Sequence, residues 1–316
     1  MTDMKQKDTN LVRLGAAFFV LIVAVILGQL LGGVVVGMLA PDALDNPLVM
    51  WGLSLGPLYL LGLPLCLLIL RKDAPVTPPK TSMKISGFLL ALMVCFGVMF
   101  AGNMIGNGLS TLIGQLKGAP VTNPLQEILT SSDVWMTVLP TVIVAPFGEE
   151  FIFRRLIIDR ARRWGELPAI LLSAAMFAAF HMNLYQIFYA FLVGCVLGYV
   201  YIKTGRLRYS IAMHAIINFR GGVYPMLMLQ GMMPFVSGGE NMTYVQILVA
   251  LLSALGIILL YLIYIGCLIA TIVLACMHLK RLPLAPGEGG RHIWRSPFVI
   301  LFFAVCVGMT VLPLLG

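Results

Sequence analysis

The sequence predicts an all-α fold, a polytopic transmembrane helical bundle with about eight or nine transmembrane helices. Of its 316 residues, 60% are hydrophobic and 11% are charged, whereas a soluble domain carries about 25% charged residues. Several apolar runs exceed the roughly 18 residues that a helix needs to span a bilayer. These runs do not alternate with period two, which argues against the strands of a membrane β-barrel.

Nine helices are expected in chain order, at about 14–39, 51–70, 87–112, 134–163, 167–181, 187–202, 209–221, 245–277 and 297–315. The fifth is short for a full crossing, so we expect it to end at membrane depth, whereas the eighth is long enough to tilt or to project into water. The seventh is expected to break around Gly221, Gly222 and Pro225. Gly102 and Gly106, four residues apart in the third, are expected to let a neighbouring helix approach closely.

The chain divides into three predicted parts. Residues 1–113 hold the first three helices, residues 114–236 hold helices four to seven, and residues 237–316 hold the last two. Polar side chains inside helices are concentrated in the middle part, so we expect a functional site there, in a core of four to five helices. The inverted repeat that many transporters contain is not visible in this sequence.

The basic residues favour a cytoplasmic N-terminus. If all nine helices cross from that side, every Lys and Arg except Lys117 and Arg220 falls in the cytoplasmic half, as the positive-inside rule requires. The acidic residues that fall on the opposite side are Asp42, Asp45, Glu127, Asp133 and Glu240. The net charge of +8 is therefore spread over short clusters and does not form the continuous basic face of a nucleic-acid-binding protein. The polar segment 1–13 is followed by a first helix that has no A-x-A cleavage site, so we expect this helix to be retained in the mature protein. We expect the protein to lie in a bacterial plasma membrane.

Three motifs place polar side chains inside apolar helices, namely Glu149-Glu150-x-x-x-Arg154, Phe177-x-x-x-His181 and His214-x-x-x-Asn218. A charged side chain near the bilayer centre costs about 2.5–3.5 kcal/mol on insertion scales. Taken alone, each motif is explained by packing, as an ion pair, a hydrogen-bonded core histidine or a polar contact between helices. Their occurrence together on adjacent helices favours a catalytic or substrate site.

The two glutamates are expected to have different roles. Side chains four residues apart share one helix face, so Glu150 can pair with Arg154 while Glu149 points about 100° away. Two neighbouring carboxylates in a dry site cannot both ionise cheaply. Arg154 can hold Glu150 as a carboxylate, which leaves Glu149 to exchange a proton with water as a general base. The reverse assignment within the pair stays open.

The remaining polar groups fit the hydrolysis of an amide. His181 is expected to position the water or to carry its proton, and His214 and Asn218 to donate hydrogen bonds to the oxyanion. A serine or cysteine nucleophile is then not needed. The six cysteines lie in apolar runs without a C-x-x-C pair, so we interpret them as buried hydrophobes and not as disulfide or metal-binding residues.

A catalytic zinc ion is the alternative mechanism. Glu149, His181 and His214 are ordinary zinc ligands, although the H-E-x-x-H motif is absent and the two histidines lie on different helices. The metal-free mechanism, which needs no cofactor, is favoured, and the metal mechanism stays open.

The three motifs, in this order and spacing, resemble the CPBP family of CAAX proteases and bacteriocin-processing enzymes, also called the Abi family. The resemblance covers roughly residues 120–220. It implies an intramembrane endopeptidase whose partners are the lipid bilayer and a membrane-associated protein or peptide substrate, with or without a lipid at its C-terminus. In that family the first glutamate activates water, and the histidines and the asparagine complete the site. By position, the resemblance implies that these residues are Glu149, His181, His214 and Asn218. Arg155 stands where the family often has glycine.

Two further functions stay open. A non-catalytic membrane scaffold or a bacteriocin self-immunity protein of the same fold would need none of these polar groups. A proton-coupled transporter would use Glu149 and His181 as a proton relay.

Overall fold

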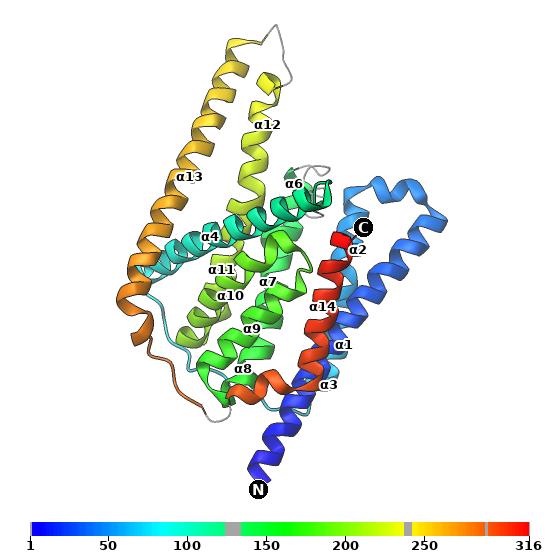
Figure 1. The fold of residues 1–316 in the computed structure, drawn as a ribbon, viewed down its shortest axis with the longest axis vertical. Helices are drawn as coiled ribbons and strands as arrows, with labels where there is room; N and C mark the ends of the chain where they lie inside the picture. Colours follow the sequence, from blue (N-terminus) through cyan, green and yellow to red (C-terminus); the bar gives the residue numbers. More distant parts are fainter. Residues whose placement is uncertain (1, 124–133, 237–241, 288–289, 316) are drawn as a thin grey trace.

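The computed structural model describes residues 2–123, 134–236, 242–287 and 290–315. Every regular element within these ranges is a helix, which confirms the predicted all-α fold (Figure 1). Glu127, Asp133 and Glu240, which the charge argument assigns to the side opposite the cytoplasm, lie outside the described residues.

Seven helical segments of the described chain are long and apolar enough to cross a membrane, which indicates an integral membrane protein. They are α1 (Thr2–Leu39), α2 to α3 (Pro47–Leu70), α4 (Ile85–Lys117), α6 to η5 (Val134–Trp164), α10 (Leu184–Thr204), α13 with η7 (Tyr244–Arg281) and α14 (Pro297–Leu315). The fifth predicted helix is α9 (Glu166–Phe180), with 15 residues. At 1.5 Å per residue α9 is about 22 Å long, which is shorter than the roughly 30 Å of a hydrocarbon core.

The helix that carries the two glutamates alternates between α and π geometry. It runs through α6 (Val134–Val138), η3 (Leu139–Val144), α7 (Ala145–Glu149), η4 (Glu150–Ile158), α8 (Asp159–Ala161) and η5 (Arg162–Trp164), of which η3 and η4 are π-helical. Pro140 and Pro146 each remove a backbone N–H from this helix. The change from α to π geometry falls between Glu149 and Glu150, and π turns of this kind are frequent at functional sites.

The seventh predicted helix does not break at Gly221 and Gly222, so that expectation was wrong. Instead, α11 (Leu207–Asn218) continues through the π-helical segment η6 (Phe219–Val223) into α12 (Tyr224–Val236). Pro225 lies at the second position of α12. The wider π turn before it removes the clash between the proline ring and the carbonyl of the preceding turn, so the helix continues.

Two buried clusters hold the bundle together. The first joins residues of α1, α3, η4, α9, α10 and α14, and therefore helices from all three predicted parts of the chain. The second joins residues of α4, α10, α11 and α13. Helix α10 belongs to both clusters and packs against α4 and α9, near the centre of the molecule (Figure 1).

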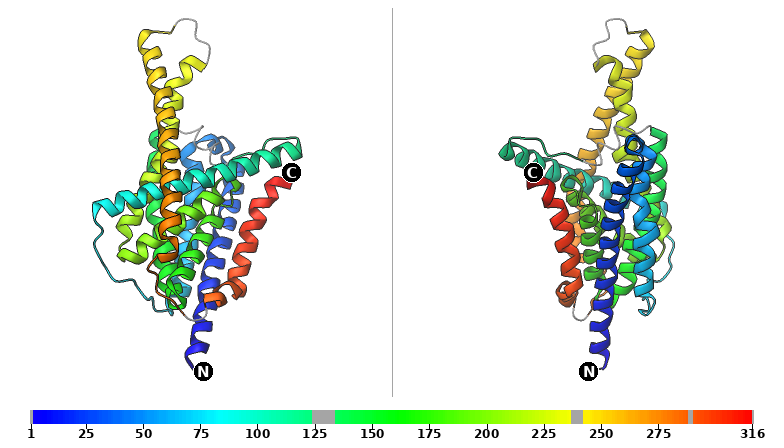
Figure 2. Two further views of the ribbon diagram at one scale, coloured as in Figure 1. Left: turned by 60° about the vertical axis from the view of Figure 1, so that its left-hand side comes forward. Right: turned by 90° about the vertical axis from the view of Figure 1, so that its right-hand side faces the viewer.

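Helix α4 crosses close to α10, as the glycine spacing predicts. A Cβ atom on Gly102 would meet the backbone of Tyr189, and one on Gly106 would meet the carbonyl oxygen of Tyr185. The two glycines therefore remove the side chains that would separate these helices. Figure 2 shows α4 running obliquely across the bundle, and α12 and α13 extending together beyond it.

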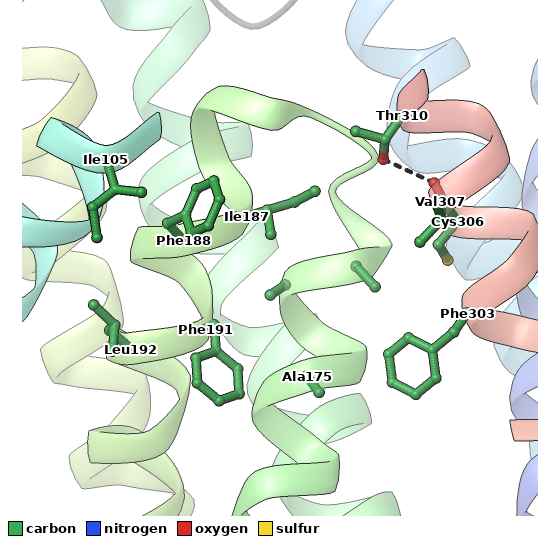
Figure 3. Close-up of a pocket in the computed structure, with 12 residues that line it drawn as sticks. Ile105, Ala175, Ile187, Phe188, Phe191, Leu192, Phe303, Cys306, Val307 and Thr310 are labelled. Atoms are coloured by element: carbon green, nitrogen blue, oxygen red, sulfur yellow. Dashed lines mark hydrogen bonds between the residues drawn. The ribbon is translucent and has the colours of Figure 1, made fainter. Parts of the chain in front are cut away.

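An apolar cavity of about 420 Å³ lies between α4, α9, α10 and α14 (Figure 3). Ile105, Phe188, Phe191 and Phe303 form much of its wall. The hydroxyl of Thr310, which also lines it, donates to the carbonyl of Cys306 one turn earlier. The cavity lining contains none of the predicted site residues, so the polar chemistry must be sought elsewhere.

Candidate active site

His214, on α11, lies between the two adjacent glutamates. Its Nδ1 is 3.0 Å from Oε1 of Glu150, and its Nε2 is 3.5 Å from Oε2 of Glu149. The imidazole and the Glu150 side chain are buried, whereas the Glu149 side chain is 16% exposed. Of the two carboxylates, Glu149 is therefore the one that solvent or a substrate can reach.

The buried Glu150 forms an ion pair with Arg154. The Nε of Arg154 lies 3.2 Å from Oε2 of Glu150, and both side chains are completely buried. This is the pair that the spacing of four residues predicts. A carboxylate held by a guanidinium only accepts hydrogen bonds, so Nδ1 of His214 must donate to it. The other ring nitrogen, Nε2, faces Glu149.

Ser173, on α9, binds one end of the Arg154 guanidinium, whose Nη2 is buried without a hydrogen-bond partner among the described residues. Sequence analysis missed this serine. Nη1 of Arg154 donates to the hydroxyl of Ser173 at 3.1 Å, and that hydroxyl donates to the carbonyl of Phe153 at 2.6 Å. A buried ion pair repays its desolvation only when further hydrogen bonds satisfy its remaining polar atoms. A serine in an apolar helix carries no local signal of such a role.

Phe177, on α9, lies among the charged and polar groups of the site. The Arg154 guanidinium stacks over its ring, 4.8 Å from the centroid. The ring centroids of His181 and His214 are 4.9 Å and 5.6 Å from that of Phe177, both in edge-on contact. Phe177 thus packs against both histidines and sets the spacing between them.

His181 ends α9 and is oriented by the backbone. Its Nδ1 lies 2.8 Å from the carbonyl oxygen of Phe177. Because a carbonyl only accepts, Nδ1 carries the proton and Nε2 keeps a lone pair. The next residue, Met182, has a φ of 47°, in the left-handed region that residues other than glycine rarely adopt. Strain of this kind clusters at functional sites, and sequence analysis did not foresee it.

Asn218 connects α11 to the helix of the glutamates. Its Nδ2 donates to the carbonyl of Thr141, in η3, at 2.8 Å. The amide carries two N–H groups, and among the described residues only one of them has a partner, so the other is available to a ligand. The structure therefore brings Glu149, Glu150, Arg154 and His214 into direct contact, and ties Asn218 to the same helix.

The donor set does not fit a zinc site. Across the described parts of the chain, no three or more His, Cys, Asp or Glu side chains gather closely enough to hold a metal ion. The predicted ligands Glu149, His181 and His214 therefore do not form such a group.

Comparison with known proteins identifies one family. Residues 131–220 match the family model described as Rce1-like, type II CAAX prenyl endopeptidase. No curated protein and no solved structure matches the chain. The matched residues contain all three motifs and the helices η3 to α11 on which the contacts above depend. The chain therefore carries, at residues 131–220, a domain of the Rce1-like CAAX prenyl endopeptidase family, which confirms the CPBP resemblance and implies a protease embedded in a membrane.

Proposed function

We propose that this protein is an intramembrane endopeptidase that hydrolyses a peptide bond with water activated by Glu149. The observation that carries the proposal is the contact of His214 with both glutamates, at 3.0 Å to Glu150 and 3.5 Å to Glu149. The imidazole therefore connects two carboxylates in different surroundings. Glu150 is buried against Arg154, whereas Glu149 remains accessible.

In the proposed reaction Glu149 takes a proton from water while the water oxygen adds to the carbonyl carbon. The C–N bond of the tetrahedral intermediate then breaks, and the proton passes from Glu149 to the leaving nitrogen. The products are a carboxylic acid and an amine. Nε2 of His214 lies 3.5 Å from Oε2 of Glu149, and a proton on Nε2 that is shared with the carboxylate would hold Glu149 in place.

Two further residues complete the proposed site. The free N–H of Asn218 donates to the oxyanion, since its other N–H is bonded to Thr141. His181 offers the lone pair of Nε2 to the attacking water, because its Nδ1 is bonded to Phe177. Sequence analysis assigned His214 to the oxyanion, but both of its nitrogens face carboxylates, so we assign it to orienting Glu149 instead.

We propose a membrane-associated protein or peptide as the substrate, with a lipid near its C-terminus as the first candidate to test. The matched family is described as a prenyl endopeptidase, and the two glutamates lie in a helical segment, Val134–Trp164, that is long and apolar enough to cross a membrane. A lipidated peptide would reach such a site from the bilayer.

The test uses the full-length chain purified into lipid nanodiscs. Two peptides of the same sequence are supplied, one with a farnesylated cysteine near its C-terminus and one with serine at that position, and products are identified by mass spectrometry. Wild-type protein should cleave the farnesylated peptide, and Glu149→Gln should lower the rate by about 10²–10⁴, the contribution of a general base.

The control is Asp45→Asn, which makes the same chemical change at an exposed carboxylate between α1 and α2 and should leave cleavage unchanged. Cleavage by Glu149→Gln at the wild-type rate would overturn the assignment of the base. Equal cleavage of both peptides would retain the endopeptidase and remove the lipid from the substrate class. Peptide uptake into proteoliposomes without cleavage would support the transporter instead.

A further inference from the structure

Tyr59 reaches the helix of the glutamates from outside the family-matched residues. It lies in the π-helical segment η2 (Leu58–Gly62), which follows Pro57 in the second predicted helix. Its hydroxyl donates to the carbonyl of Val144 at 3.0 Å, at the junction of η3 and α7. A residue of the first three helices therefore holds the segment that ends in Glu149.

The same ring lies against Gly148, the residue before Glu149. A Cβ atom built on Gly148 would overlap the hydroxyl of Tyr59 and the adjacent ring carbons. Val144, the last residue of η3, and Gly148, in α7, are four residues apart and so share one face of this helix. Tyr59 covers this face, with its hydroxyl bonded at one end and its ring packed where a side chain would otherwise stand.

The position of Tyr59 is itself determined by α1. Gly62, three residues later in η2, packs against α1, where a Cβ atom would lie 3.1 Å from the carbonyl oxygen of Leu21. Leu58, which precedes Tyr59, is buried in the first core cluster together with Leu21. The tyrosine therefore projects from a part of the backbone that cannot shift easily.

We propose that Tyr59 is a positioning residue for Glu149, acting through the backbone of α7; the proposal rests on the proposed function of that glutamate. Glu149 follows Gly148 directly, so a rotation or shift of α7 would change the 3.5 Å contact between Glu149 and His214. The hydrogen bond to Val144 and the contact with Gly148 oppose that movement. The N-terminal helices thereby contribute to the geometry of a site whose other members lie in the Rce1-like domain.

The first test is kinetic and uses Tyr59→Phe, which removes the hydroxyl and keeps the ring. We expect kcat for peptide cleavage to fall about tenfold with KM nearly unchanged, since a misplacement of 1 Å at a catalytic group can cost on the order of 100-fold. The matched control is Tyr224→Phe, which removes the same type of bond, from a tyrosine hydroxyl to the carbonyl of Gly256 in α13. This control should retain wild-type kcat. Equal kcat for wild type and Tyr59→Phe would overturn the proposal.

The second test does not depend on cleavage. Gly148→Ala places a methyl group in the space of the Tyr59 ring, so it should lower Tm by roughly 2–4 °C or more in the wild-type background. In the Tyr59→Ala background the space is free, and Gly148→Ala should lower Tm by less than half as much. Identical effects of Gly148→Ala in both backgrounds would show that the contact does not exist.

A third measurement follows Glu149 itself. The rate at which its carboxyl group reacts with a hydrophobic carbodiimide, measured by mass spectrometry of the labelled peptide, should change in Tyr59→Phe and equal wild type in Tyr224→Phe. If wild-type protein cleaves no peptide, the proposed function fails, yet the unfolding and labelling measurements still decide the role of Tyr59. Unchanged labelling in Tyr59→Phe would contradict the positioning role.

Discussion

His214 and Glu150 are joined inside the bundle by a hydrogen bond of 3.0 Å between Nδ1 and Oε1. Glu150 is held in turn by Arg154, and Arg154 by the hydroxyl of Ser173. The buried chain of contacts ends at Nε2 of His214, which faces Glu149. A buried ion pair thus orients the imidazole that faces the accessible carboxylate.

Replacing Glu150 should damage the fold, whereas replacing Glu149 should not. Glu150→Gln leaves the Arg154 charge buried without a partner, which typically costs about 3–5 kcal/mol. We expect this loss in the free energy of unfolding by denaturant titration in detergent. Glu149→Gln, at the partly exposed carboxylate, is the control and should unfold close to wild type. The double variant Glu150→Gln, Arg154→Met should regain stability, and a failure to regain it would contradict the role of the ion pair.

Chelators should not inhibit peptide cleavage. In the described part of the chain, no three or more His, Cys, Asp or Glu side chains lie close enough together to hold a metal ion. The measurement is the cleavage rate before and after incubation with EDTA or 1,10-phenanthroline. Loss of activity that added zinc restores would show that the metal mechanism applies.

Glu166 should make the protein lose stability in acid. At the start of α9 it accepts a hydrogen bond of 2.9 Å from the N–H of Ala285 and another of 2.9 Å from Arg162, and it lies 3.5 Å from the Nζ of Lys203. Burial alone would raise the pKa of Glu166, but the Ala285 N–H, Arg162 and Lys203 together outweigh it and hold the pKa below its usual value.

A carboxyl group whose pKa is lower in the folded state stabilises the fold above its unfolded pKa, which is about 4.3 for glutamate. That stabilisation is lost as the pH falls through the folded pKa. We therefore expect wild type to exceed Glu166→Gln in Tm at pH 6, and the difference to shrink as the pH falls below about 4.3. A difference that does not vary with pH would contradict the prediction.

The N-terminus is predicted to lie in the cytoplasm. Figure 1 shows the N-terminus and the end of α3 toward the bottom of the view and the end of α1 well above them, in keeping with a crossing by each segment. An alkaline phosphatase fused after Asp45 should be active, because it would lie outside, and one fused after Lys80 should be inactive. The opposite pattern would show the reverse orientation.

Properties that depend on neighbouring residues could be predicted from the sequence. Hydropathy located the helices, and the boundaries of α14 (Pro297–Leu315) agree with the expectation. The spacing of four identified the pairing of Glu150 with Arg154 and the close approach at Gly102 and Gly106. Each of these follows from chain length or from the pitch of one helix, so no tertiary information was needed.

The tertiary structure decided what depends on the approach of distant segments. His214 contacts Glu149 and Glu150 across more than 60 residues because α11 packs against α7 and η4, and spacing within one helix carries no record of that packing. The helix continues through Gly221 because the π turn before Pro225 makes room for the proline ring. The helix propensities of single residues do not predict such a π turn. Tyr59 lies beside Gly148 only once α1, η2 and α7 are packed together.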